Sequence, residues 1–300
     1  MDQLIPVKNF ISGFTTCQYL RNEKVEQVAL EDKQLGVHKV WSKLKHKLVQ
    51  PPPELPKAEP APCGDNESSL PAPEYAWEAL YPEGSINPSG EIPGGFGFYL
   101  SGPPAFAKSL ENASEAVFSY RMMIQEGWEW VKGGKVPGVF GGNGDLSYGC
   151  TGGRQEERCQ CFNLRPMWRP NSVGELYAYF PLTTENRDQL LAVPPKSIEN
   201  SDYGFSVGRD AFRFDRAVGR WIAVAFRIKL NDVGCTNGEI ELWIDGQSVI
   251  KTDGLTLRSS QDGKIKGMHF QTFFGGNGKD WASPKDQKAW FADVSGVIVH

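Results

Sequence analysis

The stretches CFNLRPMWR (residues 161–169) and GELYAYFP (residues 174–181) decide how this chain is interpreted. Side chains two residues apart on a β-strand point to the same face. Asn163 and Arg165 therefore share one face of the first predicted strand, and Tyr177 and Tyr179 share one face of the second. If the strands are neighbours in one sheet, a guanidinium, an amide and two phenols converge on one surface. Such a surface suits a substrate that carries carboxylates and a proton transfer beside them.

Outward from these stretches, the pattern from about residue 90 onward is that of a β protein. We expect strands at residues 97–101, 116–125, 162–168, 175–181, 203–207, 221–230, 239–244, 266–274 and 289–299. Several of them alternate apolar and polar side chains, and Asp245-Gly246 is typical of a hairpin turn. Many strands with turns between them predict an all-β fold, a two-sheet β-jelly-roll sandwich over residues 91–300.

The N-terminal part has a different composition. Residues 1–50 are polar, and residues 35–48 have the pattern of a short amphipathic helix with a basic, solvated face. Eight prolines fall within residues 51–73, and such segments are extended. We therefore expect a polar, Pro-rich N-terminal extension, with residues 51–90 as a linker.

Composition narrows the classes of function. The formal net charge of −4 argues against non-specific nucleic-acid binding, and no apolar run is long enough to span a membrane as a helix. We expect a monomer with no nucleic-acid or membrane partner. The first eight residues lack the charged-then-apolar order of a secretory signal, which favours a cytoplasmic location or another export route.

Three of the six cysteines, Cys150, Cys159 and Cys161, lie within twelve residues. Their spacing fits common zinc patterns poorly, and no histidine is near them in sequence. We expect one local disulfide, from Cys150 to either Cys159 or Cys161, with no metal and no cofactor.

The convergent residues suit one reaction in particular, the cleavage of uronic-acid polymers by β-elimination. The proton α to a carboxylate becomes acidic enough only when Arg, Lys or Asn neutralises that group. Tyrosine can act as base or acid once nearby cations lower its pKa from about 10. Lys135, between glycines that let the backbone approach a ligand, is the lysine candidate.

Four further residues are candidates for substrate binding. His269 and Gln271 share a face of their predicted strand. Trp128 could stack on a sugar ring, although core packing is the commoner role of such an aromatic side chain. Arg209, which follows a glycine, could hold a carboxylate at the edge of a cleft.

Beyond these residues, seven stretches resemble one known family in order and in spacing. They are KGGKVPGVFGG (residues 132–142), CTGG (150–153), LRPMWR (164–169), GELYAY (174–179), YGFSVGR (203–209), HFQTFFGG (269–276) and WASPKD (281–286). The chain is similar through them to polysaccharide lyase family 14, which includes alginate and glucuronan lyases. The similarity covers about residues 93–300.

The resemblance implies a β-jelly roll with a catalytic cleft, and secretion. The family's key lysine matches Lys135, its arginine matches Arg165, and its alternating tyrosines match Tyr177 and Tyr179. Asn163 stands where members usually have serine. We therefore expect a metal-independent lyase acting on glucuronan, or on alginate, in which the tyrosines serve as base and acid. Lys135, Arg165 and Asn163 would neutralise the carboxylate. The alternative is a non-catalytic jelly-roll module that binds acidic carbohydrate.

Overall fold

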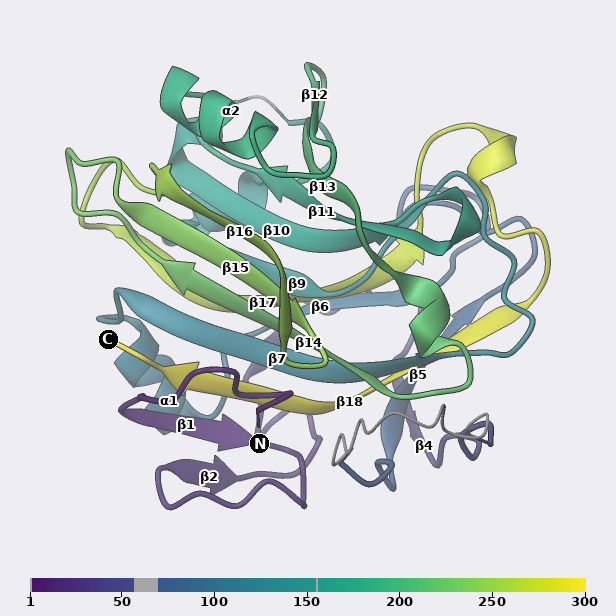
Figure 1. Cartoon of the computed structure of the whole chain (residues 1–300). Coiled ribbons are helices and arrows are strands. Elements are labelled where there is room, and N and C mark those ends of the chain that lie inside the picture. Colours follow the sequence, from purple (N-terminus) through teal and green to yellow (C-terminus); the bar gives the residue numbers. More distant parts are fainter. Residues whose placement is uncertain (1, 57–69, 155) are drawn as a thin grey trace, which may run out of the picture.

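The computed structural model describes residues 2–56, 70–154 and 156–300. Within these residues the chain forms two nine-stranded sheets that pack face to face, with two short α-helices at the periphery (Figure 1). Apolar side chains from both sheets share one buried core, for example Trp77 and Tyr120 of the first sheet with Phe270 of the second. The predicted two-sheet jelly-roll sandwich is confirmed.

The first sheet has the order β16-β15-β14-β7-β18-β1-β2, with β5 pairing β18 and β4 pairing β5. Its strands are β1 (Ser12–Thr15), β2 (Val25–Gln27), β4 (Lys47–Val49), β5 (Ala76–Tyr81), β7 (Glu115–Ile124), β14 (Ile222–Lys229), β15 (Gly238–Ile244), β16 (Gln247–Leu255) and β18 (Gln287–Ile298).

The second sheet has the order β12-β13-β11-β10-β8-β17-β6-β3, with β9 pairing both β10 and β17. Its strands are β3 (Val37–His38), β6 (Phe96–Leu100), β8 (Gly134–Lys135), β9 (Gly138–Asn143), β10 (Cys161–Trp168), β11 (Val173–Tyr179), β12 (Ile198–Asn200), β13 (Gly204–Arg213) and β17 (Gly263–Phe274). The helices are α1 (Pro104–Leu110) and α2 (Thr184–Leu191), and neither has the length and apolarity to span a membrane.

Alternation along the strands explains which side chains enter the core. In β15, Ile240, Leu242 and Ile244 are buried, whereas Glu239 points outward and pairs with Arg227 and Lys229 on β14. All nine predicted strands are present, eight of them within three residues of their expected bounds, whereas β13 continues six residues beyond the predicted end at residue 207. The predicted turn at Asp245-Gly246 joins β15 to β16, and both of its residues have positive φ, as a two-residue hairpin of type I′ requires.

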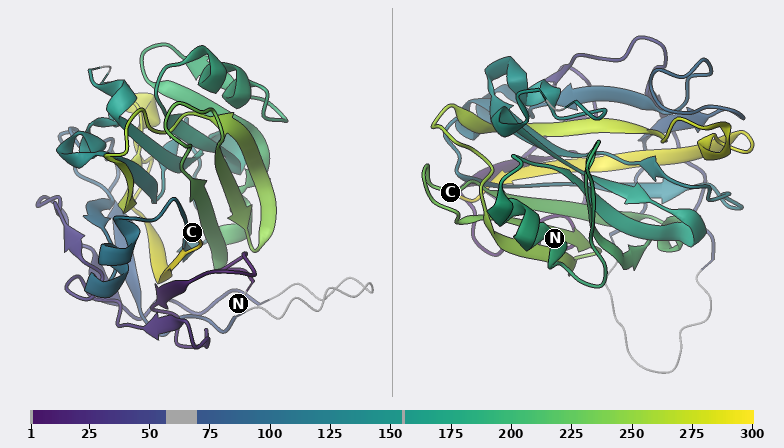
Figure 2. Two further views of the ribbon diagram at one scale, coloured as in Figure 1. Left: turned by 90° about the vertical axis from the view of Figure 1, so that its left-hand side faces the viewer. Right: turned by 90° about the horizontal axis from the view of Figure 1, so that it is seen from above.

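The N-terminal part is integrated into the sandwich rather than tethered to it. Strand β1 pairs with β18, so a strand near the start of the chain lies beside the last strand (Figure 2). Strand β5 also pairs with β18, which places a sheet strand inside the predicted linker. The domain boundary predicted at residue 91 is therefore wrong, because residues before it supply strands to both sheets. Most of the Pro-rich stretch, residues 57–69, lies outside the described residues.

The helix predicted over residues 35–48 is also wrong. Gly36 and Lys39 have positive φ, which interrupts any helix, and the segment instead forms β3, a series of turns and β4. Leu35 is fully buried, and the His46 ring lies 4.4 Å from the ring of Phe98. Single side chains of the segment therefore pack on the sandwich, whereas Val40 and Leu48 are exposed, and no helical apolar stripe is formed.

Candidate active site

Strands β10 and β11 are antiparallel neighbours in the second sheet. Asn163 lies opposite Tyr179, and Arg165 lies opposite Tyr177. Directly opposed residues in a sheet present their side chains on the same face. The prediction that the two tyrosines share a surface with Asn163 and Arg165 is therefore confirmed.

Lys135 joins this group from β8, where it lies opposite Met167 of β10 and Phe273 of β17. Its Nζ donates a hydrogen bond to Tyr179 Oη at 2.9 Å and lies 4.6 Å from the centre of the Tyr177 ring. The flanking glycine has a role in packing rather than in ligand approach, because a Cβ at Gly134 would overlap the Trp168 ring.

A cavity of about 670 Å³ opens over these residues. Four cationic side chains line it, Lys135, Arg154, Arg165 and Arg169, and its lining within the described chain includes no Asp or Glu. Both tyrosines, Gln271 and Trp281 complete its polar and aromatic walls. The cavity is therefore an electropositive site that suits an acidic ligand.

Arg165 is the most unusual of these cations. Its side chain is only 1 % exposed, and its Nη1 donates to Gln271 Oε1 at 2.8 Å. No carboxylate within the described residues forms an ion pair with it, and its Nε lacks a hydrogen-bond acceptor there. A buried guanidinium without a counter-charge is costly to the fold. Such a cost to the free energy of folding is expected at a site where a bound ligand supplies the negative charge.

The surrounding charges determine which groups hold protons. Burial, together with the positive charges of Arg165 and Arg169, holds the pKa of Lys135 well below its usual value of 10.5. Burial raises the pKa of Tyr177, and the neighbouring Tyr179 raises it further. Burial also raises the pKa of Tyr179, although Arg165 and Arg158 oppose that effect. The electrostatics thus favour the neutral amine of Lys135 beside the protonated phenols of Tyr177 and Tyr179.

Asn163 and His269 form a pair beside this group. Asn163 Nδ2 lies 2.9 Å from His269 Nδ1, and neither side chain is more than 3 % exposed. Burial and the charges of Arg165 and Lys135 hold the pKa of His269 well below 6.5, so the ring is neutral and Nδ1 can accept the amide hydrogen. Asn163 does not line the cavity, and its contact is with His269 rather than with the space where a ligand would bind.

Two of the predicted binding residues lie elsewhere. Trp128 packs in the core against Trp168 and Phe274, which contradicts the predicted stacking on a sugar ring. Arg209 does not line the cavity, because its Nε donates to Glu175 Oε2 at 2.6 Å.

Glu175 in turn holds Arg169, which was not among the predicted site residues. The carboxylate is fully buried, and its Oε1 accepts hydrogen bonds from Nε and Nη2 of Arg169 at 2.9 and 2.6 Å. This two-point contact fixes the guanidinium of Arg169 at the cavity wall. Arg169 was visible in the sequence only as part of the LRPMWR stretch.

Comparison with known proteins shows the family of the chain. The family model described as Polysaccharide lyase 14 matches residues 71–294. The chain belongs to polysaccharide lyase family 14. A crystal structure of the family 14 alginate lyase from Aplysia kurodai is 30% identical, with a TM-score of 0.65 over 78% of this chain and 85% of that chain. The alginate lyase from Chlorella virus is 21% identical, with a TM-score of 0.60 over 75% of this chain and 85% of that chain. No curated protein sequence matches the chain.

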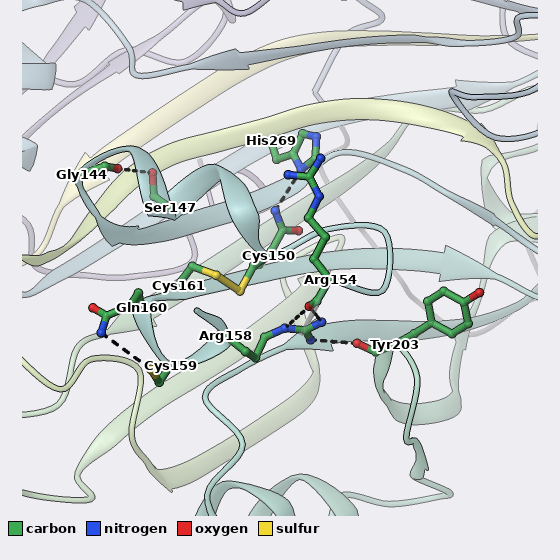
Figure 3. Close-up of a disulfide and its surroundings, with 11 residues drawn as sticks. Gly144, Ser147, Cys150, Arg154, Arg158, Cys159, Gln160, Cys161, Tyr203 and His269 are labelled. Atoms are coloured by element: carbon green, nitrogen blue, oxygen red, sulfur yellow. Dashed lines mark hydrogen bonds between the residues drawn. A yellow bond between two sulfur atoms is a disulfide. The ribbon is translucent and has the colours of Figure 1, made fainter. Parts of the chain in front are cut away.

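In this family 14 chain, a disulfide-closed loop covers one side of the site. Cys150 pairs with Cys161, which settles the two predicted alternatives, and Cys159 remains an exposed free thiol. Figure 3 shows Arg154 and Arg158 projecting from this loop beside the disulfide. The Arg158 guanidinium lies 4.9 Å from the centre of the Tyr179 ring and donates to the Tyr203 carbonyl at 2.8 Å. No sequence signal marked Arg154 or Arg158 in advance, because only the closed loop places Arg154 at the cavity and Arg158 beside the Tyr179 ring.

The disulfide allows a prediction about stability. Replacing Cys150 and Cys161 together by serine is expected to lower the free energy of unfolding by about 2–4 kcal/mol, because the unfolded chain gains freedom. Urea unfolding of the variant and of the native protein measures the difference. Cys159→Ser is the matched control and should leave the midpoint unchanged. Equal midpoints for all three proteins would contradict a stabilising disulfide.

No group of three or more His, Cys, Asp and Glu side chains in the described parts of the chain is placed to hold a metal ion. The metal independence of the reaction stays a prediction.

Proposed function

We propose that this protein is a polysaccharide lyase that cleaves uronic-acid polymers by β-elimination. The single observation that carries the proposal is Arg165, a buried guanidinium without a protein counter-charge on the floor of a cavity with four cationic side chains. A substrate carboxylate supplies that counter-charge. Arg165 and Gln271 then hold the carboxylate, and the positive field stabilises the enediolate that forms when the α proton leaves.

Lys135 is the base in this proposal, in place of the charge-neutralising role that its position in the sequence suggested. Its depressed pKa supports a neutral amine with a free lone pair. In the reaction the bond between the α carbon and its hydrogen breaks, and the proton passes to Lys135 Nζ. The electron pair moves onto the carboxylate, which becomes the enediolate, and then forms the double bond to the β carbon as the bond from that carbon to the glycosidic oxygen breaks.

Tyr179 is the acid that protonates the departing oxygen. Its raised pKa keeps the phenol protonated, and its Oη lies 2.9 Å from Lys135 Nζ. After the phenol has given its proton to the glycosidic oxygen, the Lys135 ammonium returns a proton along this hydrogen bond. Both side chains then regain their starting states, and every proton is accounted for. Tyr177, protonated and packed beside them, shapes the site and hydrogen-bonds the sugar.

The test is ultraviolet absorbance of the purified protein incubated with alginate, glucuronan and their oligomers. Elimination leaves a conjugated unsaturated uronate that absorbs, whereas hydrolysis does not. The 30% identical relative is an alginate lyase, so alginate is the first polymer to try, although glucuronan was the substrate first expected from the sequence. A rising signal on one polymer supports the proposal and identifies the substrate. A flat trace on all polymers, with binding seen by calorimetry, favours the non-catalytic module.

The pH dependence of the lyase tests the role of Lys135. Because only the neutral amine accepts a proton, kcat/KM should rise with pH through the depressed pKa of Lys135 and then level off. Arg169→Gln removes one of the charges that lowers this pKa, so the rising limb should move to higher pH.

The measurement is a profile of kcat/KM against pH for the native protein, Arg169→Gln and Arg187→Gln. The exposed Arg187 on α2 provides the control, since Arg187→Gln should leave the limb in place. A limb that stays fixed, or moves to lower pH, in Arg169→Gln would show that Lys135 is not the titrating base.

A further inference from the structure

A second cavity, of about 410 Å³, adjoins the first and shares Thr151 and Gln271 with it. One wall comes from the second sheet, through Tyr99 on β6 and His269 on β17. The rest of its lining includes Lys39, Val40, Trp41 and Ser42, which form a second wall. These four residues precede residue 71, where the match to the family begins, so this wall is an addition to the part of the chain that the family describes.

The added wall is fixed to the sandwich on both sides. Before it, β3 pairs with β6 at Leu100 and Tyr99. Within it, the Trp41 N–H donates to the Gly97 carbonyl at 2.7 Å. After it, the His46 ring packs on Phe98, and His46 Nε2 lies 2.7 Å from a carboxylate oxygen of Asp32. Residues 39–42 are therefore held in a fixed position beside the cavity by contacts on both sides.

The side chains that line the second cavity are of the types that bind an acidic sugar. Lys39 is its positive charge, and its Nζ lies 4.3 Å from the centre of the Tyr148 ring. The backbone of Lys39 has φ 49°, a conformation that side-chain-bearing residues adopt at a cost and that recurs at ligand sites. Trp41 offers an aromatic ring, and Ser42 and Gln271 offer hydrogen bonds. Within the described residues, no Asp or Glu lines the cavity to oppose a carboxylate.

We propose that residues 39–42 form an additional subsite, which binds a uronate unit of the polymer beyond the unit held at Arg165. The inference rests on the proposed function and extends it to longer chains. Gln271 connects the two sites, because it lines both cavities and accepts a hydrogen bond from Arg165. Binding energy from a remote sugar unit lowers the barrier only for substrates long enough to reach it. The subsite therefore makes turnover depend on chain length.

The experiment compares the native protein with the double variant Lys39→Glu/Trp41→Ala on uronate oligomers of increasing length. On long oligomers and polymer, kcat/KM should fall by roughly tenfold or more, since each subsite contact contributes to affinity. On the shortest oligomer that is cleaved, kcat/KM should stay unchanged. The control is Lys45→Ala, an exposed lysine of the same segment that does not line the cavity. Thermal unfolding of each variant checks that the fold is retained.

The outcomes separate this inference from the proposed function. An equal loss on every length, or no loss on any, overturns the subsite. If the native protein yields no unsaturated product on any uronate, the lyase proposal fails, and calorimetry of the same oligomers then decides about the subsite. An affinity that rises with length in the native protein but not in the double variant supports it. An affinity that is the same in both proteins, or no binding at all, overturns the subsite.

Discussion

Tyr179→Phe is expected to lower kcat by about 10²–10⁴-fold, the usual contribution of a positioned acid or base. The substitution removes only Oη, which bonds to Lys135 Nζ, and keeps the ring that packs beside Lys135 and Arg158. The fold should therefore be retained while the leaving oxygen departs without a proton. Initial rates of absorbance increase on the preferred polymer measure the effect.

A substrate with a better leaving group sharpens this test. A uronate that carries fluoride on its β carbon needs no proton from an acid, so Tyr179→Phe should regain most of its activity on that substrate. A variant of Lys135, such as Lys135→Met, should stay inactive on it, because the α proton still has no acceptor. Tyr75→Phe, an exposed tyrosine, is the matched control. Undiminished rates of Tyr179→Phe on the polymer would exclude its role as the acid.

The sequence was sufficient to predict the centre of the site. Alternation along two neighbouring strands placed Arg165 and Tyr177 on one face, because the period of two leaves no other arrangement once the strands pair. Lys135 was predicted from its neighbouring glycines and from the family resemblance, since β8 has only two residues and carries no periodic signal. The local disulfide followed from the spacing of the cysteines.

What the sequence could not predict depends on pairings between distant segments. Strand β1 meets β18 across nearly the whole chain, and no local pattern indicates that partner. The wall at residues 39–42 reaches the site only because β3 pairs with β6. Trp128 and Arg209 show the converse, since each belongs to a suitable chemical type but packs against the core or pairs with Glu175. The residue type predicted what these side chains can do, and the topology decided whether they face the cavity.

Arg165→Met is expected to lower kcat/KM by about 10²–10³-fold, because the enediolate loses its main cationic partner. The same substitution should leave the free energy of unfolding unchanged or raise it. In the free protein the guanidinium is buried without a counter-charge, so its replacement by an apolar side chain of similar length removes a desolvation cost. Absorbance assays and urea unfolding on the same preparation measure both effects.

Arg121 on β7 provides the matched comparison, because it is also a buried arginine, at 3 % exposure, but it is paired. Its guanidinium forms an ion pair with Asp293 and donates to the Leu70 and Pro71 carbonyls. Arg121→Met leaves a buried carboxylate without its partner and should lower the free energy of unfolding by about 3–5 kcal/mol. Replacement of these two buried arginines by methionine is thus expected to have different effects on the free energy of unfolding. If Arg165→Met were as destabilising as Arg121→Met, Arg165 would be a structural residue and the site would lose the group that defines its substrate.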